Sequence, residues 1–158
     1  MVVDDVAAWS PSLRSRAQLV EIPKRHLVDP SLAAALLRCT PERLLEDLET
    51  FGFLFESLVT RDVRIYAQSS DAEVYHYREA GGRFEVDLIV EDRDGNWVGI
   101  EVKLGGSARI AEGARALHKL AADRVRRPPQ ALVVVTGGRY CFRRPDGVYE
   151  MPLGCLGP

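Results

Sequence analysis

The sequence of 158 residues has 46% hydrophobic and 28% charged side chains, the balance of one ordinary globular domain rather than of a disordered tail. With 21 basic and 23 acidic residues the net charge is −2, which excludes nucleic-acid binding through a large basic excess but not through a local basic face. The three cysteines have neither CxxC nor metal-ligand spacing, so neither a zinc site nor a disulfide framework is expected.

The first twenty residues carry acidic side chains where a secretory signal would be basic, and they lack its continuous apolar run. No segment approaches the roughly 18 consecutive apolar residues of a membrane-spanning helix. We therefore expect a soluble, cytoplasmic protein without a membrane partner. The same twenty residues show no clean periodicity and predict a loosely packed arm, through which the sequence permits a homodimer.

Residues 24–38 predict a short strand followed by a helix, because Asp29 is a good N-cap and Pro30 suits the first helical turn. We divide the chain at this point. An N-terminal arm with a short strand and a helix covers residues 1–40, and the main domain covers residues 41–158.

A longer helix is predicted from about residue 41 to 65. Thr40 and Pro41 repeat the start signal, and the apolar residues that follow recur at spacings of three and four. Gly52 lies inside this helix and lowers its stability, so we expect either a close contact or a break there.

Past residue 70 apolar and polar residues alternate, which is the pattern of half-buried strands. The sequence predicts three of them, at residues 73–80, 84–91 and 97–104. The segments between them, Gly81-Gly82 and Asp94-Gly95-Asn96, have the chemistry of tight turns, so the three strands should form antiparallel hairpins.

A second helix is predicted from about Ser107 to Pro128, followed by the continuous apolar run of a buried strand at residues 131–135. Because strand–helix–strand crossovers are right-handed, this strand should lie parallel to the strand before the helix. A final hairpin is predicted at the turn Pro145-Asp146-Gly147. The core order is therefore α-β-β-β-α-β, an α/β fold in which two helices flank a mixed sheet with a C-terminal hairpin.

Alternation along the second and third strands brings acidic groups and a lysine to one patch. Asp87 lies on the face opposite Val86 and Leu88, and Glu101 shares one face with Lys103. Pairing through the intervening turn makes Asp87 a near neighbour of Glu101. Two carboxylates with a nearby ammonium can hold a hard cation such as Mg²⁺, which activates a water against a phosphodiester while the lysine orients that water or neutralises developing charge.

The same pattern has a simpler interpretation as an ion pair on the solvated face of an ordinary sheet. Two features favour a site. Gly99 leaves room for a ligand to approach the sheet, and Glu56 adds a third carboxylate within the mostly apolar run FGFLFESLV. Because Glu56 also suits the solvated edge of a helix, the residues alone leave both interpretations open.

The order of a helix Glu, a strand Asp and a Glu-x-Lys resembles the PD-(D/E)XK nuclease superfamily, whose fold is the restriction-endonuclease-like α-β-β-β-α-β core. Residues 20–158, with the segments GFLFESLV, FEVDLIVE, GIEVKLG and ALVVVTGG, are also similar to a domain of unknown function found at the C-terminal end of AAA-type ATPases in bacteria and archaea. This resemblance implies that Asp87 and Glu101 bind Mg²⁺ or Mn²⁺. It further implies that Glu56 assists and that Lys103 aids the attacking water.

The ATPase that precedes this domain in the family has no counterpart in the 158 residues. The resemblance therefore implies either a stand-alone remnant or an AAA-type ATPase partner on another chain.

The helix from residue 107 and its exit are rich in basic side chains. The candidates for contacts with DNA phosphates are Arg115, Lys119, Arg124 and Arg126. The alternative is a solvated face whose aliphatic stems cover apolar surface. The three histidines lie on different elements without metal-ligand spacing, and Tyr75 and Tyr77 are expected to pack in the core rather than to stack on bases.

We thus expect a metal-dependent nuclease-like domain acting on DNA phosphodiester bonds. The alternative is a non-catalytic module of the same fold that binds DNA or regulates an AAA-type ATPase, and the small net charge favours it.

Overall fold

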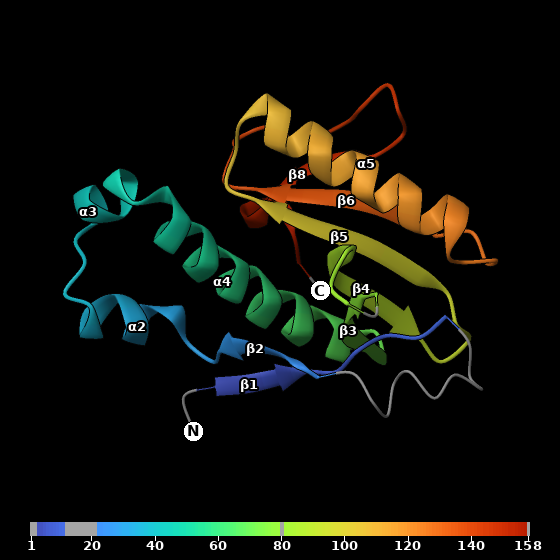
Figure 1. Ribbon diagram of the computed structural model, residues 1–158, viewed down its shortest axis with the longest axis horizontal. Helices are drawn as coiled ribbons and strands as arrows, with labels where there is room; N and C mark the ends of the chain where they lie inside the picture. The colour runs from blue at the N-terminus through green and yellow to red at the C-terminus, as the bar shows by residue number, and fades with distance from the viewer. Residues whose placement is uncertain (1–2, 12–21, 80, 158) are drawn as a thin grey trace.

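A computed structural model gives the structure of residues 3–11, 22–79 and 81–157. Its main feature is a six-stranded mixed sheet with the strand order β3-β4-β5-β6-β8-β7, beside which β1 and β2 form a two-stranded sheet (Figure 1). The strands are β1 (Val3–Val6), β2 (Lys24–Leu27), β3 (Ala72–Arg78), β4 (Glu85–Asp92), β5 (Trp97–Lys103), β6 (Ala131–Thr136), β7 (Phe142–Arg143) and β8 (Tyr149–Pro152). The helices are α2 (Pro30–Leu36), α3 (Pro41–Glu46), α4 (Leu48–Ser69), α5 (Ser107–Asp123) and the 3₁₀ turn η1 (Leu153–Cys155).

The sheet has the predicted connectivity. β3, β4 and β5 are consecutive antiparallel strands, and α5 returns the chain so that β6 lies parallel to β5, with Val98 opposite Ala131. The α/β class and the α-β-β-β-α-β order are therefore confirmed. β7 and β8 form the C-terminal hairpin, and β8 also extends the main sheet by pairing parallel to β6.

The first two helices begin where the sequence predicts. Asp29 accepts a hydrogen bond from Ser31 N at the start of α2, and Thr40 accepts one from Arg43 N at the start of α3. A proline follows each cap in the first turn, where its missing N–H has no consequence.

The single helix predicted over residues 41–65 is wrong, because the chain breaks at Asp47. This residue ends α3 and caps α4 by accepting a hydrogen bond from Thr50 N at 3.1 Å. Gly52, where a break was considered, lies within α4.

Apolar side chains pack on both faces of the sheet. α4 covers one face, and its cluster contains Phe55, Val59, Val63, Leu88, Ile100, Val102, Val133 and Val135. α5 covers the other, and its cluster contains Trp9, Val86, Ile89, Trp97, Ile110, Ala114, Leu117, Leu120, Leu132, Val134 and Val148. Among the described residues no helix is long and apolar enough to cross a membrane.

Gly99 does not leave room for a ligand, contrary to the expectation from the sequence. A Cβ at this position would lie 3.1 Å from Leu117 Cδ2 and 3.2 Å from side-chain atoms of both Leu132 and Trp97. The missing side chain therefore lets α5 and the Trp97 indole pack closely on β5.

Asp87 lies in a β-bulge of β4. Between the pairs Tyr75–Ile89 and Tyr77–Val86, β4 has one residue more than β3. Val86 consequently packs under α5 in the same cluster as Ile89, although strict alternation predicts opposite faces for residues three apart. The predicted alternation, which placed Val86 and Leu88 on one face, is therefore wrong at the bulge. Val86 packs on the α5 side of the sheet, and Leu88 packs on the α4 side.

Residues 3–11 of the predicted arm are packed against the rest of the chain, contrary to the expectation of a loosely packed segment. β1 pairs with β2, and Trp9 N donates to the carbonyl oxygen of His76 at 2.7 Å, which covers part of the β3 edge. Trp9 is only 3% exposed, and its Nε1 donates to Glu91 Oε2 at 3.0 Å. Residues 1–2 and 12–20 of the predicted arm lie outside the described residues.

Candidate functional site

The four predicted catalytic residues meet in one group although they come from three elements. Lys103 Nζ lies 2.6 Å from Glu101 Oε2 and 3.6 Å from Asp87 Oδ2. Glu56, on α4, joins them through a shared cation, because Lys24 Nζ lies 2.7 Å from Glu56 Oε1 and 3.2 Å from Asp87 Oδ1. We call the six residues Lys24, Glu56, Glu85, Asp87, Glu101 and Lys103 the acid–base cluster.

Lys24 and Glu85 are the two members of the acid–base cluster that sequence reasoning missed. Three carboxylates surround the Lys24 ammonium, since Glu85 Oε1 also lies 2.7 Å from Nζ. The signal available in the sequence is the alternation within β2, which places Lys24 and His26 on one face and Arg25 on the other. Nothing in that alternation says which acidic groups this face meets.

The backbone and both lysines hold Asp87 in place. Val102 N donates to Asp87 Oδ2 at 2.9 Å, just beyond the pair Leu88–Ile100, with which the described β4–β5 register ends. The carboxylate therefore accepts an N–H that a backbone carbonyl accepts in a regular antiparallel ladder. The bulge at Asp87 makes this substitution of side chain for backbone geometrically possible.

The two central carboxyl groups titrate very differently. Glu101 is 4% exposed, and its burial together with the Asp87 carboxylate raises its pKa to about 8. Burial acts in the same direction on Asp87, but Lys24, Lys103 and the Val102 N–H outweigh it and lower the pKa of Asp87. At neutral pH an ionised Asp87 thus faces a Glu101 that retains its proton. This burial rules out the interpretation of Glu101 and Lys103 as a solvated surface ion pair.

Glu56 is not at a solvated helix edge either, since its side chain is 18% exposed. Burial and the Asp87 carboxylate raise the pKa of Glu56, although Lys24 opposes them. Its buried Oε1 contacts the Lys24 ammonium as an ion pair but takes part in no hydrogen bond of good angle among the described residues. Burial disfavours the charged forms of Lys24 and Lys103, yet the carboxylates around them raise the pKa of both above the usual value.

The donor set fits a single hard cation. In the part of the chain that the structure describes, no group of three or more His, Cys, Asp and Glu side chains is arranged as a metal site. Mg²⁺, however, commonly takes one or two protein carboxylates and fills its remaining positions with water and phosphate oxygens. Asp87 and Glu101 supply two such carboxylates, and burial together with the facing Asp87 carboxylate raises the pKa of Glu101.

Two cavities open onto the acid–base cluster. One of about 230 Å³ lies between α4 and the end of β5, and its lining includes Glu56, Lys103 and Arg109. The other, of about 600 Å³, lies beside β2, and its lining includes Lys24 and Glu56. Lys24 and Lys103 therefore line two different cavities, and Glu56 lines both.

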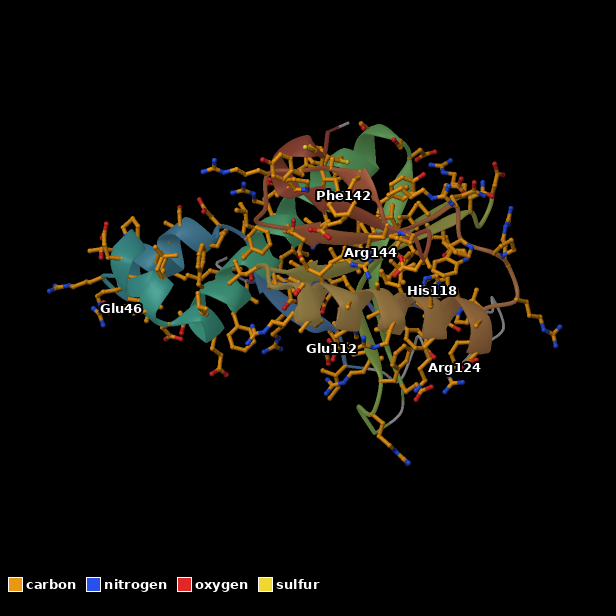
Figure 2. All side chains as sticks on the ribbon, turned by 90° about the horizontal axis from the view of Figure 1, so that it is seen from above. Glu46, Glu112, His118, Arg124, Phe142 and Arg144 are labelled. Atoms are coloured by element: carbon orange, nitrogen blue, oxygen red, sulfur yellow. The ribbon has the colours of Figure 1, made fainter. Side chains whose placement is uncertain are left out.

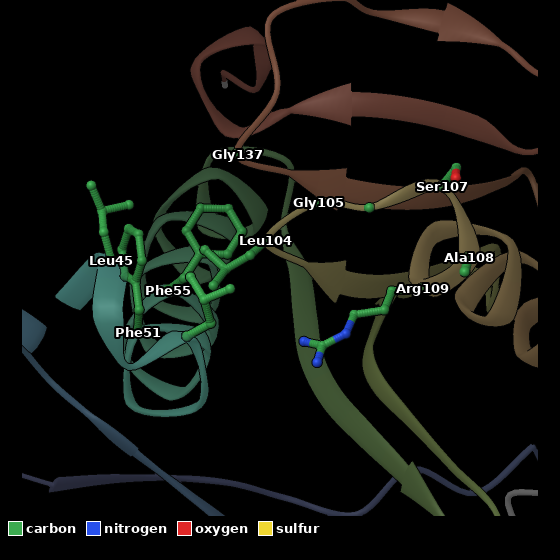
Figure 3. Close-up of a pocket in the computed structure, with 11 residues that line it drawn as sticks. Leu45, Phe51, Phe55, Leu104, Gly105, Ser107, Ala108, Arg109 and Gly137 are labelled. Atoms are coloured by element: carbon green, nitrogen blue, oxygen red, sulfur yellow. The ribbon is translucent and has the colours of Figure 1, made fainter.

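An apolar groove of about 660 Å³, whose lining Figure 3 shows, shares residues with the smaller cavity. Leu45, Phe51 and Phe55 line it from α3 and α4, and Leu104 lines it from the connection between β5 and α5. Phe55, Leu104 and Arg109 line both the groove and the smaller cavity. The described lining of the groove is mostly apolar, with Ser107 and Arg109 among its polar side chains.

Two of the four basic side chains predicted to contact DNA phosphates already have partners within the chain. Arg124 pairs with Glu79, and Lys119 Nζ lies 5.0 Å from the centroid of the Phe84 ring. Arg115 and Arg126 are exposed. Figure 2 shows Glu112 and His118 along α5 and Arg124 just beyond its last residue.

The histidines and aromatics agree with structural roles. His26 and His76 are buried, and burial together with Lys24 lowers the pKa of His26 to about 4, so its ring is neutral at pH 7. Tyr77 packs edge-on against Trp9 and Phe84, in the core position expected of it.

Comparison with family models finds one match. The model described as "Domain of unknown function (DUF4143)" matches residues 51–156, which is more than half of the chain. A domain of unknown function, expected over residues 20–158, is thus confirmed over the shorter range 51–156, and Lys24 lies outside it. A comparison with curated proteins finds no match.

Proposed function

The chain belongs to the DUF4143 family, and from its candidate site we propose that it is a metal-dependent nuclease-like domain acting on DNA phosphodiester bonds. The observation that carries the proposal is the convergence of the buried Glu101 with the half-buried Asp87 and Lys103, from two different strands, around the Lys103 ammonium. Groups whose pKa values are shifted by burial and by neighbouring charges are concentrated at functional sites.

In this proposal Asp87 and Glu101 hold Mg²⁺ or Mn²⁺, which supplies an activated water and neutralises charge on the phosphate. Glu101 must lose its proton to do so, and the cation provides the charge that favours this loss. Lys103 lines the smaller cavity, where its ammonium orients the water or neutralises the leaving oxygen. Glu56 lines the same cavity, and its raised pKa suits a group that accepts a proton.

The basic side chains nearest to this cavity suit contacts with DNA phosphates. Arg109 lines the cavity, and Arg115 is exposed on the same helix. Because the net charge is −2, the proposal relies on such local groups rather than on the overall field of the protein. DNA as the substrate also makes the cytoplasm the proposed site of action.

The test is a cleavage assay on linear, nicked and branched DNA with Mg²⁺ or Mn²⁺. Metal-dependent cutting is expected for the wild type, with loss of at least about a hundredfold in Asp87→Ala and Glu101→Ala. Glu112→Gln, an exposed position on α5, is the control and should cut normally. Cleavage that is unchanged in Asp87→Ala or Glu101→Ala contradicts the proposal.

A second candidate function is a non-catalytic module that binds DNA or regulates an AAA-type ATPase. The presence of the Lys24 ammonium among the carboxylates favours it, because a cation is already in place there. Calorimetric titration separates the two functions, since the absence of Mg²⁺ and Mn²⁺ binding at millimolar concentration supports the non-catalytic module.

A further inference from the structure

Phe53 is an aromatic side chain that stays exposed beside the acid–base cluster. It is 65% exposed on α4 and lines the smaller cavity together with Lys103 and Arg109. It also lines the cavity beside β2, to which Lys24 contributes. Because Phe53 and Glu56 are the described residues that line both cavities, the ring lies between the two cavities that open onto the cluster.

The Phe53 ring is not part of the core. The buried apolar residues of α4, among them Phe55 and Val59, pack on the sheet, whereas Phe53 belongs to neither of the two apolar clusters described for the sheet. Glu56 follows Phe53 by three residues, so the two side chains are neighbours on the side of α4 that lines the cavities. Single exposed apolar side chains are common on proteins, and what distinguishes Phe53 is its position next to a candidate reaction site.

Basic side chains lie on both sides of this ring. Arg109, which is exposed, lines the smaller cavity. Arg25 and Arg78 line the cavity beside β2, and their side chains are 77% and 53% exposed. The Lys24 ammonium pairs with the acids of that cavity and offsets part of their charge. An aromatic ring flanked by cations suits a single-stranded nucleic acid, because the phosphates contact the cations while a base stacks on the ring.

A base can stack on Phe53 only if one of its flat faces is free. Inside a duplex the neighbouring base pairs cover both faces, and a base becomes accessible only when it leaves the stack. The other occupant that suits an exposed ring is an apolar side chain of a protein partner. Such a partner would leave Arg25, Arg78 and Arg109 without an anion, so the charges around the ring favour a single-stranded nucleic acid.

We infer that Phe53 stacks on an unpaired base next to the phosphate that lies at the acid–base cluster. The domain thereby takes single-stranded DNA, or the single-stranded part of a branched molecule, in preference to intact duplex. That DNA is the ligand rests on the proposed function, and the inference adds the form of the DNA and the residue that recognises it. Phe53 determines specificity through stacking and takes no part in breaking the phosphodiester bond.

The test measures DNA binding by the full chain in a chelator, so that binding is separated from metal-dependent cleavage. Fluorescence anisotropy compares a labelled single strand of about 16 nucleotides with the duplex of the same sequence. We expect Phe53→Ala to weaken single-strand binding roughly 5- to 100-fold, through the loss of one base stack, and to leave duplex binding unchanged. The matched control is Phe142→Ala on β7, which removes a side chain that is 47% exposed and lines neither cavity, and it should bind both DNAs normally.

Phe53→Trp tests the stacking directly and keeps an aromatic ring at this position. The native Trp9 and Trp97 are buried, so a change of fluorescence on addition of DNA reports the indole at position 53. We expect single-stranded DNA to quench this fluorescence, whereas Phe142→Trp should show no quenching.

Equal single-strand affinity of Phe53→Ala and the wild type overturns the inference, as does the absence of quenching in Phe53→Trp, even if the wild type cuts DNA with Mg²⁺. An equal loss of duplex and single-strand binding also overturns it. Weaker single-strand binding together with quenching, but with no cleavage under any condition, supports the inference and rejects the proposed nuclease reaction. A wild type that binds no single strand overturns the inference and leaves the ring to a protein partner, and the cleavage assay then decides the proposed function separately.

Discussion

Glu101→Gln should stabilise the protein at alkaline pH in the absence of metal. The pKa of Glu101 is raised to about 8 in the folded chain, chiefly by burial and then by Asp87, against an ordinary value of 4.5. Above 4.5 the unfolded chain therefore gives up the proton that the folded chain retains. Stability is lost as the pH rises from 4.5 towards 8, and glutamine, which is always neutral, avoids this loss.

The structure sets the size of the effect. The folded wild type loses about 1.4 kcal/mol per pH unit between the two pKa values, relative to a chain with a neutral group at this position. Against this, glutamine changes the hydrogen-bond partner of the Lys103 ammonium, which lies 2.6 Å from Glu101 Oε2, at a cost of about 1 kcal/mol. We expect a net gain of about 3 kcal/mol at pH 8, which for a chain of this size raises Tm by about 6–12 °C.

Thermal melts in a chelator, from about pH 5 to pH 8, measure this difference. The two proteins should melt at similar temperatures at the acidic end, and the gap should open as the pH rises. Glu112→Gln, which removes an exposed carboxylate from α5, should follow the wild type throughout. If Glu101→Gln melts no higher than the wild type at pH 8, the reasoning about this buried carboxyl group is wrong.

Three further predictions concern Asp87, His26 and Gly99. Asp87→Asn removes the carboxylate that both lysines share, so we expect a loss of about 2 kcal/mol in denaturant unfolding, together with loss of Mn²⁺ binding in calorimetry; full retention of both contradicts the assigned role. His26 has its pKa lowered from 6.5 to about 4, so its contribution to stability is complete above 6.5 and falls by roughly 3 kcal/mol as the pH drops to 4. The pH dependence of His26→Gln should lack this component, and equal slopes for the two proteins in that range are the contrary result. Gly99→Ala places a Cβ about 3.1 Å from Leu117 and should cost about 1–3 kcal/mol by overpacking, seen as a lower Tm, whereas a neutral effect means that α5 yields easily.

The regular elements follow from local signals, which is why the sequence predicts them well. The alternation of β4 and β5 and the short turn between them fix their pairing, and this pairing alone brings Asp87 next to Glu101. The break at Asp47 also has a local signal, since Asp is a preferred N-cap and Thr50 follows three residues later. It was missed because the apolar spacing continues across it.

The remaining features depend on contacts between distant segments. The bulge at Asp87 shows itself only in the pairing of β3 with β4, and the filling of the space above Gly99 depends on where α5 packs. Lys24 joins Glu56 and Glu85 through the docking of β2 on α4, which no spacing within β2 encodes. For the same reason the pairing of Arg124 with Glu79 could not be anticipated from the basic composition of its helix.

The paired strands β1 and β2, together with Trp9, also determine how far the chain can be truncated for heterologous expression. A recombinant fragment limited to residues 51–156 would lack the indole that packs against Trp97 and the ammonium that balances Glu56. Its exposed apolar edge and uncompensated acids favour aggregation in the expression host. We therefore expect the smallest autonomously folding unit to be longer than residues 51–156 and to include β1, β2 and Trp9.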